Sequence, residues 1–176
     1  MERLYSKIIG MPVFTPDSLR PIYNVQDLIF DPVNGAVIAF EVGGGLVVTP
    51  MDVLSMKQGI LIKGREDVVG IDDVLRVRRV VDERMGIMGK KVVTSGGKTL
   101  GKVVDLTIDD KGLILNKLYT AKVFLGVLQR DSRVIPAKNI VEVRADCVIV
   151  KDDSGEIMVG EVEEGAEAEV VGVAEA

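Results

Sequence analysis

Short apolar stretches separated by polar turn residues run along most of the chain, and the same order of stretches occurs twice. One run extends from Gly10 to Asp31 and the other from Gly89 to Asp109. In both runs, apolar and polar positions alternate on either side of a turn rich in Gly, Pro, Asp or Ser, which is the pattern of a β-hairpin. The sequence therefore predicts two equivalent hairpins.

Each hairpin is followed by further predicted strands in the same order. Asn34-Gly35 and Lys111-Gly112 supply the next turns, and a proline later ends a strand in each copy because proline cannot donate to a ladder. A short apolar segment, residues 51–56 or 137–143, comes after each proline. The remaining predicted strands are residues 36–42, 46–50 and 60–63 in the first copy and residues 113–121, 133–136 and 147–151 in the second. Five or six short strands per copy indicate an all-β chain of two small barrels with short helical segments.

The second run carries a resemblance to a known family. It reads G-x-x-V-x-T in the first strand and G-K-V-x-D-L-x-I-D in the next, and Ile-Pro followed by an apolar segment comes later. This order of motifs resembles the PRC-barrel domain, named for the H subunit of the photosynthetic reaction centre. The matching positions are Gly89, Val92, Gly101-Lys102-Val103, Asp105, Ile108-Asp109 and Ile135-Pro136. In the first run Tyr23 stands where the second has Gly101, and residues 16–19 replace the glycine turn, so the resemblance covers residues 6–153 as two tandem copies.

The resemblance implies a compact β-barrel that acts as an adaptor. Proteins of this family resemble parts of ribosome-maturation factors, of the reaction-centre H subunit, of stress or sporulation proteins and of archaeal cell-division scaffolds. The family carries no shared catalytic motif, so no site residue is transferred to this chain. We therefore expect a non-enzymatic protein-binding module, with an accessory protein of RNA processing or ribosome maturation as the alternative.

Three parts of the chain follow from the repeat. Residues 1–80 form the first expected PRC-barrel domain with a connector, residues 81–155 the second, and residues 156–176 an acidic tail that we expect to be disordered. A terminal strand through residues 169–173 is the competing prediction for the tail. In the connector, Ile71, Val74, Leu75 and Val81 have the spacing of a short helix, although residues 74–81 can also be read as a strand.

The composition limits which kinds of catalytic and metal-binding site the chain can have. The chain has no His and a single Cys, Cys147, which excludes His-dependent catalysis, His-ligated metals and an internal disulfide, and we expect no catalytic, metal or cofactor site. Of the 27 acidic residues, seven lie in residues 155–176, so the other 154 residues carry 22 basic and 20 acidic side chains, a net charge of +2. This balance does not favour a DNA-binding protein.

The apolar runs are too short to span a membrane, and the N-terminus does not have the pattern of a signal peptide. We therefore expect a cytoplasmic location, and we expect no small-molecule substrate.

The copies differ most between residues 119 and 132, where the second has eight extra residues. This insert contains the apolar residues Val123, Phe124, Leu125, Val127 and Leu128. A long apolar connection either folds back over its own domain or contacts a partner. The five residues are therefore candidate contacts for a protein partner or for self-association.

Overall fold

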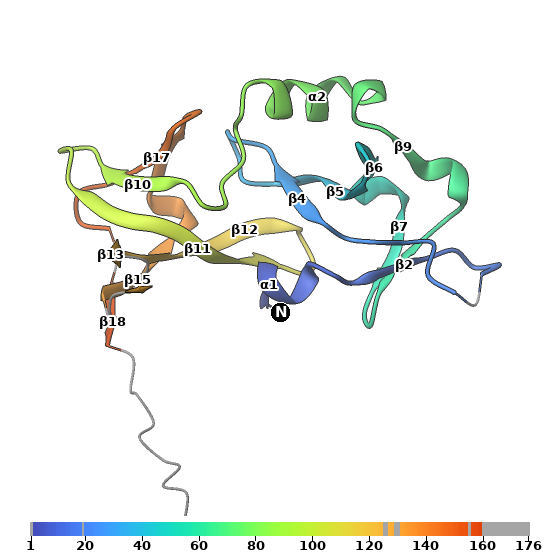
Figure 1. Ribbon diagram of the computed structural model, residues 1–176, viewed down its shortest axis with the longest axis horizontal. Helices are drawn as coiled ribbons and strands as arrows, with labels where there is room; N and C mark the ends of the chain where they lie inside the picture. Colours follow the sequence, from blue (N-terminus) through green and yellow to red (C-terminus); the bar gives the residue numbers. More distant parts are fainter. Residues whose placement is uncertain (1, 19, 125–126, 129–130, 155, 160–176) are drawn as a thin grey trace, which may run out of the picture.

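Strands dominate the computed structural model, which describes residues 2–18, 20–124, 127–128, 131–154 and 156–159 (Figure 1). Two α-helices, α1 (Tyr5–Ile8) and α2 (Leu75–Asp82), occur within these ranges. The expected all-β fold class is confirmed. Short 3-10 helices connect some of the strands: η1 (Pro50–Asp52), η2 (Arg65–Asp67), η3 (Ile71–Asp73) and η4 (Ala137–Asn139).

The first half of the chain forms two four-stranded sheets. In one, β2 lies between β3, which is antiparallel to it, and β8, which is parallel, while β7 is antiparallel to β8. In the other, the order is β4-β5-β6-β9 with antiparallel neighbours. The strands are β2 (Pro12–Phe14), β3 (Tyr23–Asn24), β4 (Asp27–Phe30), β5 (Val37–Gly43), β6 (Leu46–Val48), β7 (Val53–Met56), β8 (Ile60–Ile62) and β9 (Val68–Gly70).

The second half repeats these pairings within one sheet of order β16-β17-β10-β11-β12-β15-β18. Strand β10 is antiparallel to β11 and parallel to β17, as β2 is to β3 and β8. The long strand β11 corresponds to β3 and β4 together. The strands are β10 (Lys91–Thr94), β11 (Thr99–Asp109), β12 (Ile114–Ala121), β15 (Asp131–Pro136), β16 (Ile140–Val143), β17 (Cys147–Val150) and β18 (Glu156–Val159), and a further strand, β1 (Glu2–Leu4), pairs with the end of β11.

A glycine accounts for the continuity of β11. Gly101 has a φ of +126°, and a Cβ atom there would lie 2.4 Å from the carbonyl oxygen of Ala121 in β12. Only glycine lets the two backbones approach this closely. The first half has Tyr23 at the register position of Gly101, and there the strand is interrupted between β3 and β4.

The two halves meet at equivalent turns that are related by a local two-fold axis. The turns after β4 and β11 both close with a hydrogen bond to an aspartate carbonyl, from Gly35 to Asp31 at 2.9 Å and from Leu113 to Asp109 at 2.8 Å. Both donating residues have positive φ, 70° and 49°. These turns contact each other through an isolated bridge between residues 36 and 114.

The hydrogen bonds beside this bridge are reciprocal. The N–H of Val37 donates to the carbonyl of Leu113 at 2.7 Å, and the N–H of Leu115 donates to the carbonyl of Gly35 at 2.9 Å. Each half thus makes the same contact to the other, as in an isologous dimer interface. One apolar core extends through both halves and includes Phe40 of the first and Leu118 of the second.

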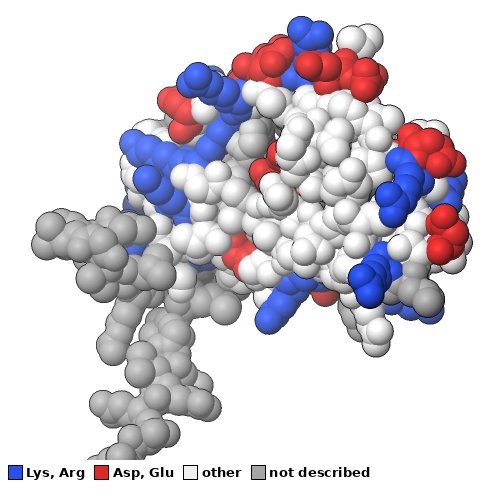
Figure 2. Space-filling view, turned by 45° about the vertical axis from the view of Figure 1, so that its right-hand side comes forward, with Lys and Arg blue, Asp and Glu red and all other residues white. Residues whose placement is uncertain are grey.

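Helix α2 covers the outer face of β4, β5 and β6, as its position at the top of Figure 1 shows. The helix predicted in the connector is confirmed, and of the residues that indicated it, Ile71 and Val74 pack against the apolar cluster under α2 just before the helix begins. Val77 and Val80 pack against the sheet, whereas Leu75 is 79% exposed. The outer face of α2 carries ion pairs from Arg78 to Asp82 at 3.5 Å and from Arg79 to Glu83 at 2.9 Å, so the arginines lie among carboxylates (Figure 2).

The C-terminal boundary also differs from the expectation. The tail was expected to be disordered from residue 156, but Glu156–Val159 form β18 along β15, with Arg133 opposite Ile157. A free edge of β15 offers backbone N–H and C=O groups, and this pairing satisfies them. Residues 160–176, and with them the alternative strand through residues 169–173, lie outside the described residues.

Candidate functional site

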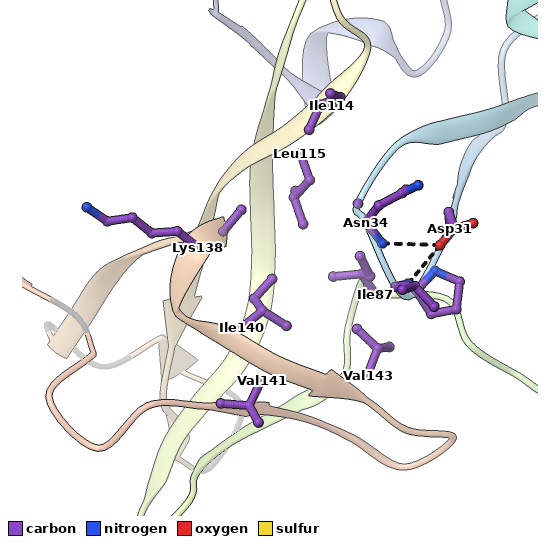
Figure 3. Close-up of a pocket in the computed structure, with 13 residues that line it drawn as sticks. Asp31, Asn34, Ile87, Ile114, Leu115, Lys138, Ile140, Val141 and Val143 are labelled. Atoms are coloured by element: carbon purple, nitrogen blue, oxygen red, sulfur yellow. Dashed lines mark hydrogen bonds between the residues drawn. The ribbon is translucent and has the colours of Figure 1, made fainter.

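A groove of about 250 Å³ lies where the two halves meet (Figure 3). One wall is the turn after β4, and the other is formed by η4, β16 and the start of β12. The lining residues are Asp31, Pro32, Val33, Asn34, Gly35, Ile87, Ile114, Leu115, Ala137, Lys138, Ile140, Val141 and Val143. Most of these side chains are apolar, and Figure 3 shows Lys138 directed away from the groove. The groove is therefore suited to an apolar group.

The rim of the groove exposes apolar side chains from both halves. Val33 is 93% exposed, Val141 57% and Ile114 46%. Val141 is unpaired within an irregularity of β16, because Ile140 and Glu142 are opposite Val150 and Ile149 of β17. Apolar side chains gathered around one groove are typical of a contact surface.

Asp31 fixes the shape of the first wall. One carboxylate oxygen accepts hydrogen bonds from the N–H groups of Val33 at 2.8 Å and Asn34 at 3.2 Å, and the other accepts from Arg76 of α2 at 3.0 Å. Burial of the carboxyl group raises the pKa of Asp31, but Arg76 and the two N–H groups outweigh it, so the pKa lies below its ordinary value. The turn is thus held by a carboxylate that stays ionised at neutral pH.

The local two-fold axis relates the groove to a second position, between the turn after β11 and strand β7. The N-terminal strand β1 fills this second position. There the guanidinium of Arg3 in β1 donates to the carboxylate of Asp110 at 2.9 and 3.0 Å and to the carbonyl oxygens of Met56 at 3.2 Å and Lys57 at 3.1 Å. Asp110 belongs to the turn after β11, and Met56 ends β7, which is the equivalent of β16. An extended segment therefore bridges turn and edge strand at one of the two related positions.

The two equivalent aspartates, Asp27 and Asp105, have a structural role. Each accepts a hydrogen bond from the next N–H, that of Leu28 at 2.7 Å or of Leu106 at 2.8 Å. Helix α1 lies between them, since the Tyr5 hydroxyl donates to Asp27 at 2.8 Å and the following serine hydroxyl donates to Asp105 at 2.6 Å.

A second carboxylate faces Asp27. Glu41 lies opposite it across β4 and β5, and burial, followed by the charge of Asp27, raises the pKa of Glu41. Burial likewise raises the pKa of Tyr5, with Asp27 contributing next. Within the described residues, no group of three or more Cys, Asp or Glu side chains is arranged to hold a metal ion.

The predicted partner-binding residues are only partly described. The backbones of Val123 and Phe124 form β13, which pairs with β14, Val127 and Leu128, in a small hairpin. Leu125 lies outside the described residues. Whether this hairpin contacts a partner stays a prediction.

Gly97-Lys98-Thr99 and Cys147 also lie in ordinary structural positions. Residues 95–98 form a turn between β10 and β11, with the N–H of Thr94 donating to the carbonyl of Lys98 at 2.8 Å, so Gly97-Lys98-Thr99 belongs to a hairpin. Cys147 is half-buried in β17. Burial and the adjacent Asp146 raise the pKa of its thiol.

The strand order and the apolar groove define a small, strand-rich module with the features of a binding surface. Residues 87–157 match the PRC-barrel domain, so the second half of the chain contains one such domain. This part of the sequence resemblance is confirmed, while the match gives no evidence for a second copy in the first half. A comparison with curated proteins found no match. None of the described helices is long and apolar enough to cross a membrane.

Proposed function

We propose that this chain is a non-enzymatic, cytoplasmic adaptor whose groove binds an extended segment of a partner protein. The observation that carries the proposal is the N-terminal strand at the related position, where Arg3 bridges a turn and an edge strand. The groove has the two equivalent walls, a turn and an edge strand, but these walls offer apolar side chains in place of the polar groups that Arg3 contacts. An extended segment that places an apolar side chain among Ile87, Ile140 and Val143 would fill it.

The proposal includes a second, diverged PRC-barrel unit in residues 1–80. Its support is the shared strand order of the halves and the reciprocal hydrogen bonds between Val37 and Leu113 and between Leu115 and Gly35. An adaptor built from two related units has two related edges, β7 and β16. One unit can then hold the N-terminal strand while the other binds a partner.

Ile114→Lys with Val141→Lys tests the groove, because both side chains are at least 46% exposed and the change adds charge at the rim. The matched control is Met51→Lys with Leu54→Lys, since Met51 in η1 is 85% exposed and Leu54 in β7 is 54% exposed. Proteins captured from the native host with crosslinking should be lost with the first variant and kept with the second, with equal melting temperatures. If both variants reduce the capture of proteins equally, or if neither variant reduces it, the groove is not the binding site. Sedimentation of the purified chain distinguishes self-association from a different partner.

An accessory role in RNA processing is the second candidate, and the observation that favours it is a pair of lysines. Lys91 and Lys102 are directly opposite each other in β10 and β11, and both are exposed. If the protein binds RNA through them, purified protein should carry nucleic acid by its absorbance ratio and release it as salt is raised. A protein free of nucleic acid at low salt would count against this role.

A further inference from the structure

The outer face of β10 and β11 carries like charges without a described counterion. Lys91 and Lys102 are opposite each other, which places their Cβ atoms roughly 5 Å apart in a ladder pair and disfavours the fold electrostatically. Both are exposed, while their neighbours Val92 and Val103 are buried, so both side chains are on the solvent side. We call Lys91, Lys102 and the adjacent exposed turn residue Lys98 the lysine face.

Asp146 precedes Cys147, the residue opposite Lys91, and its charge and side-chain hydrogen bond help to raise the pKa of the Cys147 thiol. Two further acidic residues near this face are bound to other groups. Asp105 accepts hydrogen bonds from the hydroxyl and the N–H of Ser6, at 2.6 and 3.2 Å, and Asp152 accepts from the N–H of Gly96 at 2.6 Å. Neither Lys91 nor Lys102 forms an ion pair with another residue of the described part of the chain. The lysine face therefore offers positive charge to an acidic segment.

The chain holds such a segment close to this face. Residues 160–176, which lie outside the described residues, contain six glutamates and no lysine or arginine. The last described residue, Val159, ends β18 opposite Asp131, at the start of β15. Arg133 of β15 is opposite Thr120, and the next residue of β12, Ala121, is opposite Lys102. The C-terminal segment thus leaves from the end of the sheet at which the lysines lie.

The distance is short compared with the length of the segment. From β18 to β10 there are four strand spacings in the sheet order, roughly 19 Å at about 4.8 Å each. An extended chain covers about 3.3 Å per residue, so roughly six residues reach Lys91. A tethered segment of this length has an effective concentration on the order of millimolar.

We propose that the lysine face binds the chain's own acidic C-terminal segment, through the glutamates at positions 161, 163, 164, 167 and 169. The contact neutralises the lysine pair and screens this face from other polyanions. An RNA or an acidic partner must therefore displace the segment to bind here. The surface is separate from the groove, so the proposal can fail while the groove-binding function holds, and the reverse.

Zero-length carbodiimide crosslinking of the full-length, nucleic-acid-free monomer, followed by mass spectrometry, tests the contact. Crosslinks are expected from Lys91 and Lys102 to the five glutamates, and they should fall at least tenfold in Lys91→Glu with Lys102→Glu and when all five glutamates are replaced by Gln. The matched control is Lys57→Glu with Lys111→Glu, which makes the same charge change at two exposed lysines away from this face and should keep the crosslinks.

The native cysteine supplies an independent readout, because Cys147 is opposite Lys91 on the other side of β10. Its rate of modification by a thiol reagent should rise at least roughly threefold when the five glutamates are replaced by Gln or when salt screens the contact. Melting temperatures should stay equal, so that the change reports access and not unfolding. Absence of the crosslinks in the wild type, with a labelling rate that the glutamine variant leaves unchanged, would overturn the proposal. Crosslinks from the five glutamates that reach Lys57 and Lys111 as often as Lys91 and Lys102 would overturn it as well.

Discussion

Substitution of Gly35 by Ala tests the junction between the halves directly. Gly35 has a φ of +70°, and an added Cβ would lie 3.2 Å from the Cβ of Leu115, across the local two-fold. Gly44, in the turn between β5 and β6, provides a control, because its φ is +65° and an added Cβ would meet nothing within 4 Å. Both substitutions place an L-residue in the left-handed region, so the difference between them isolates the contact with Leu115.

The expected losses in the free energy of unfolding follow from two contributions, the left-handed backbone and the contact with Leu115. The left-handed backbone costs a non-glycine residue about 1 to 2 kcal/mol, which is the loss expected for Gly44→Ala. A 3.2 Å contact forces a small shift in a packed core, and overpacking of this kind costs about 1 to 3 kcal/mol more, so Gly35→Ala should lose about 2 to 5 kcal/mol. Since a domain is stable by about 5 to 15 kcal/mol, the larger loss is readily measured.

Urea unfolding followed by circular dichroism gives both free energies, since the chain has no Trp to report fluorescence. A single transition with an unchanged slope is expected for the wild type and both variants, because one core extends through the two halves. Equal losses for Gly35→Ala and Gly44→Ala would refute the close packing of Gly35 against Leu115. Two separate transitions in the wild type would refute the shared core.

Three further outcomes test other parts of the structure. Phe124→Ser with Leu125→Ser tests the insert as a second contact in addition to the groove: capture of a partner should fall while the melting temperature stays unchanged, and a large drop in melting temperature would mean that the insert packs on its own domain. A chain ending at Ser154 should melt several degrees below one ending at Val159, because it lacks β18, and equal melting temperatures would contradict that pairing. Glu41→Gln should stabilise the protein at pH 7 in urea unfolding. Because the pKa of Glu41 is raised in the folded state, this carboxyl group stabilises the wild type only at low pH, and that stabilisation is lost as the pH rises through the folded pKa. The free energy of unfolding that Gln adds should therefore vanish near pH 4. An added stability that is independent of pH would contradict the raised pKa.

Most strands could be predicted because a half-buried strand leaves a local alternation in the sequence. The turns at Asn34-Gly35 and Lys111-Gly112 and the closing strands β8 and β17 occur within a residue or two of their predicted positions. The strand β18 was missed because its stability comes from an open edge of β15, which the residues of the tail do not reveal. Within α2, the apolar residues Leu75 and Val81 are exposed, and only the position of the sheet decides that Val77 and Val80 are the buried ones.

The groove could not be predicted, since the residues of its two walls are about 80 to 110 positions apart in the sequence. Asp31 and Val33 form one wall, and Ile140 and Val141 form the other. The repeat contained one relevant signal, namely that equivalent turns in two related units can meet about a two-fold axis. The candidate residues chosen from the insert were selected by apolar composition, which cannot distinguish self-packing from a contact surface.

The way in which the halves differ separates structural from functional positions. At the junction, Gly35 and Leu113 both keep the left-handed conformation, although only one of them is glycine, because the reciprocal hydrogen bonds require it on both sides. Away from the junction the outer faces have diverged: α2 covers β4, β5 and β6 in the first half, and the pair Lys91 and Lys102 of the second half stands where the first half pairs Pro12 with Asn24. Since each face can change without disturbing the shared core, selection for a partner can act there. The sites that give this chain its particular role should therefore lie on the groove rim and the lysine face.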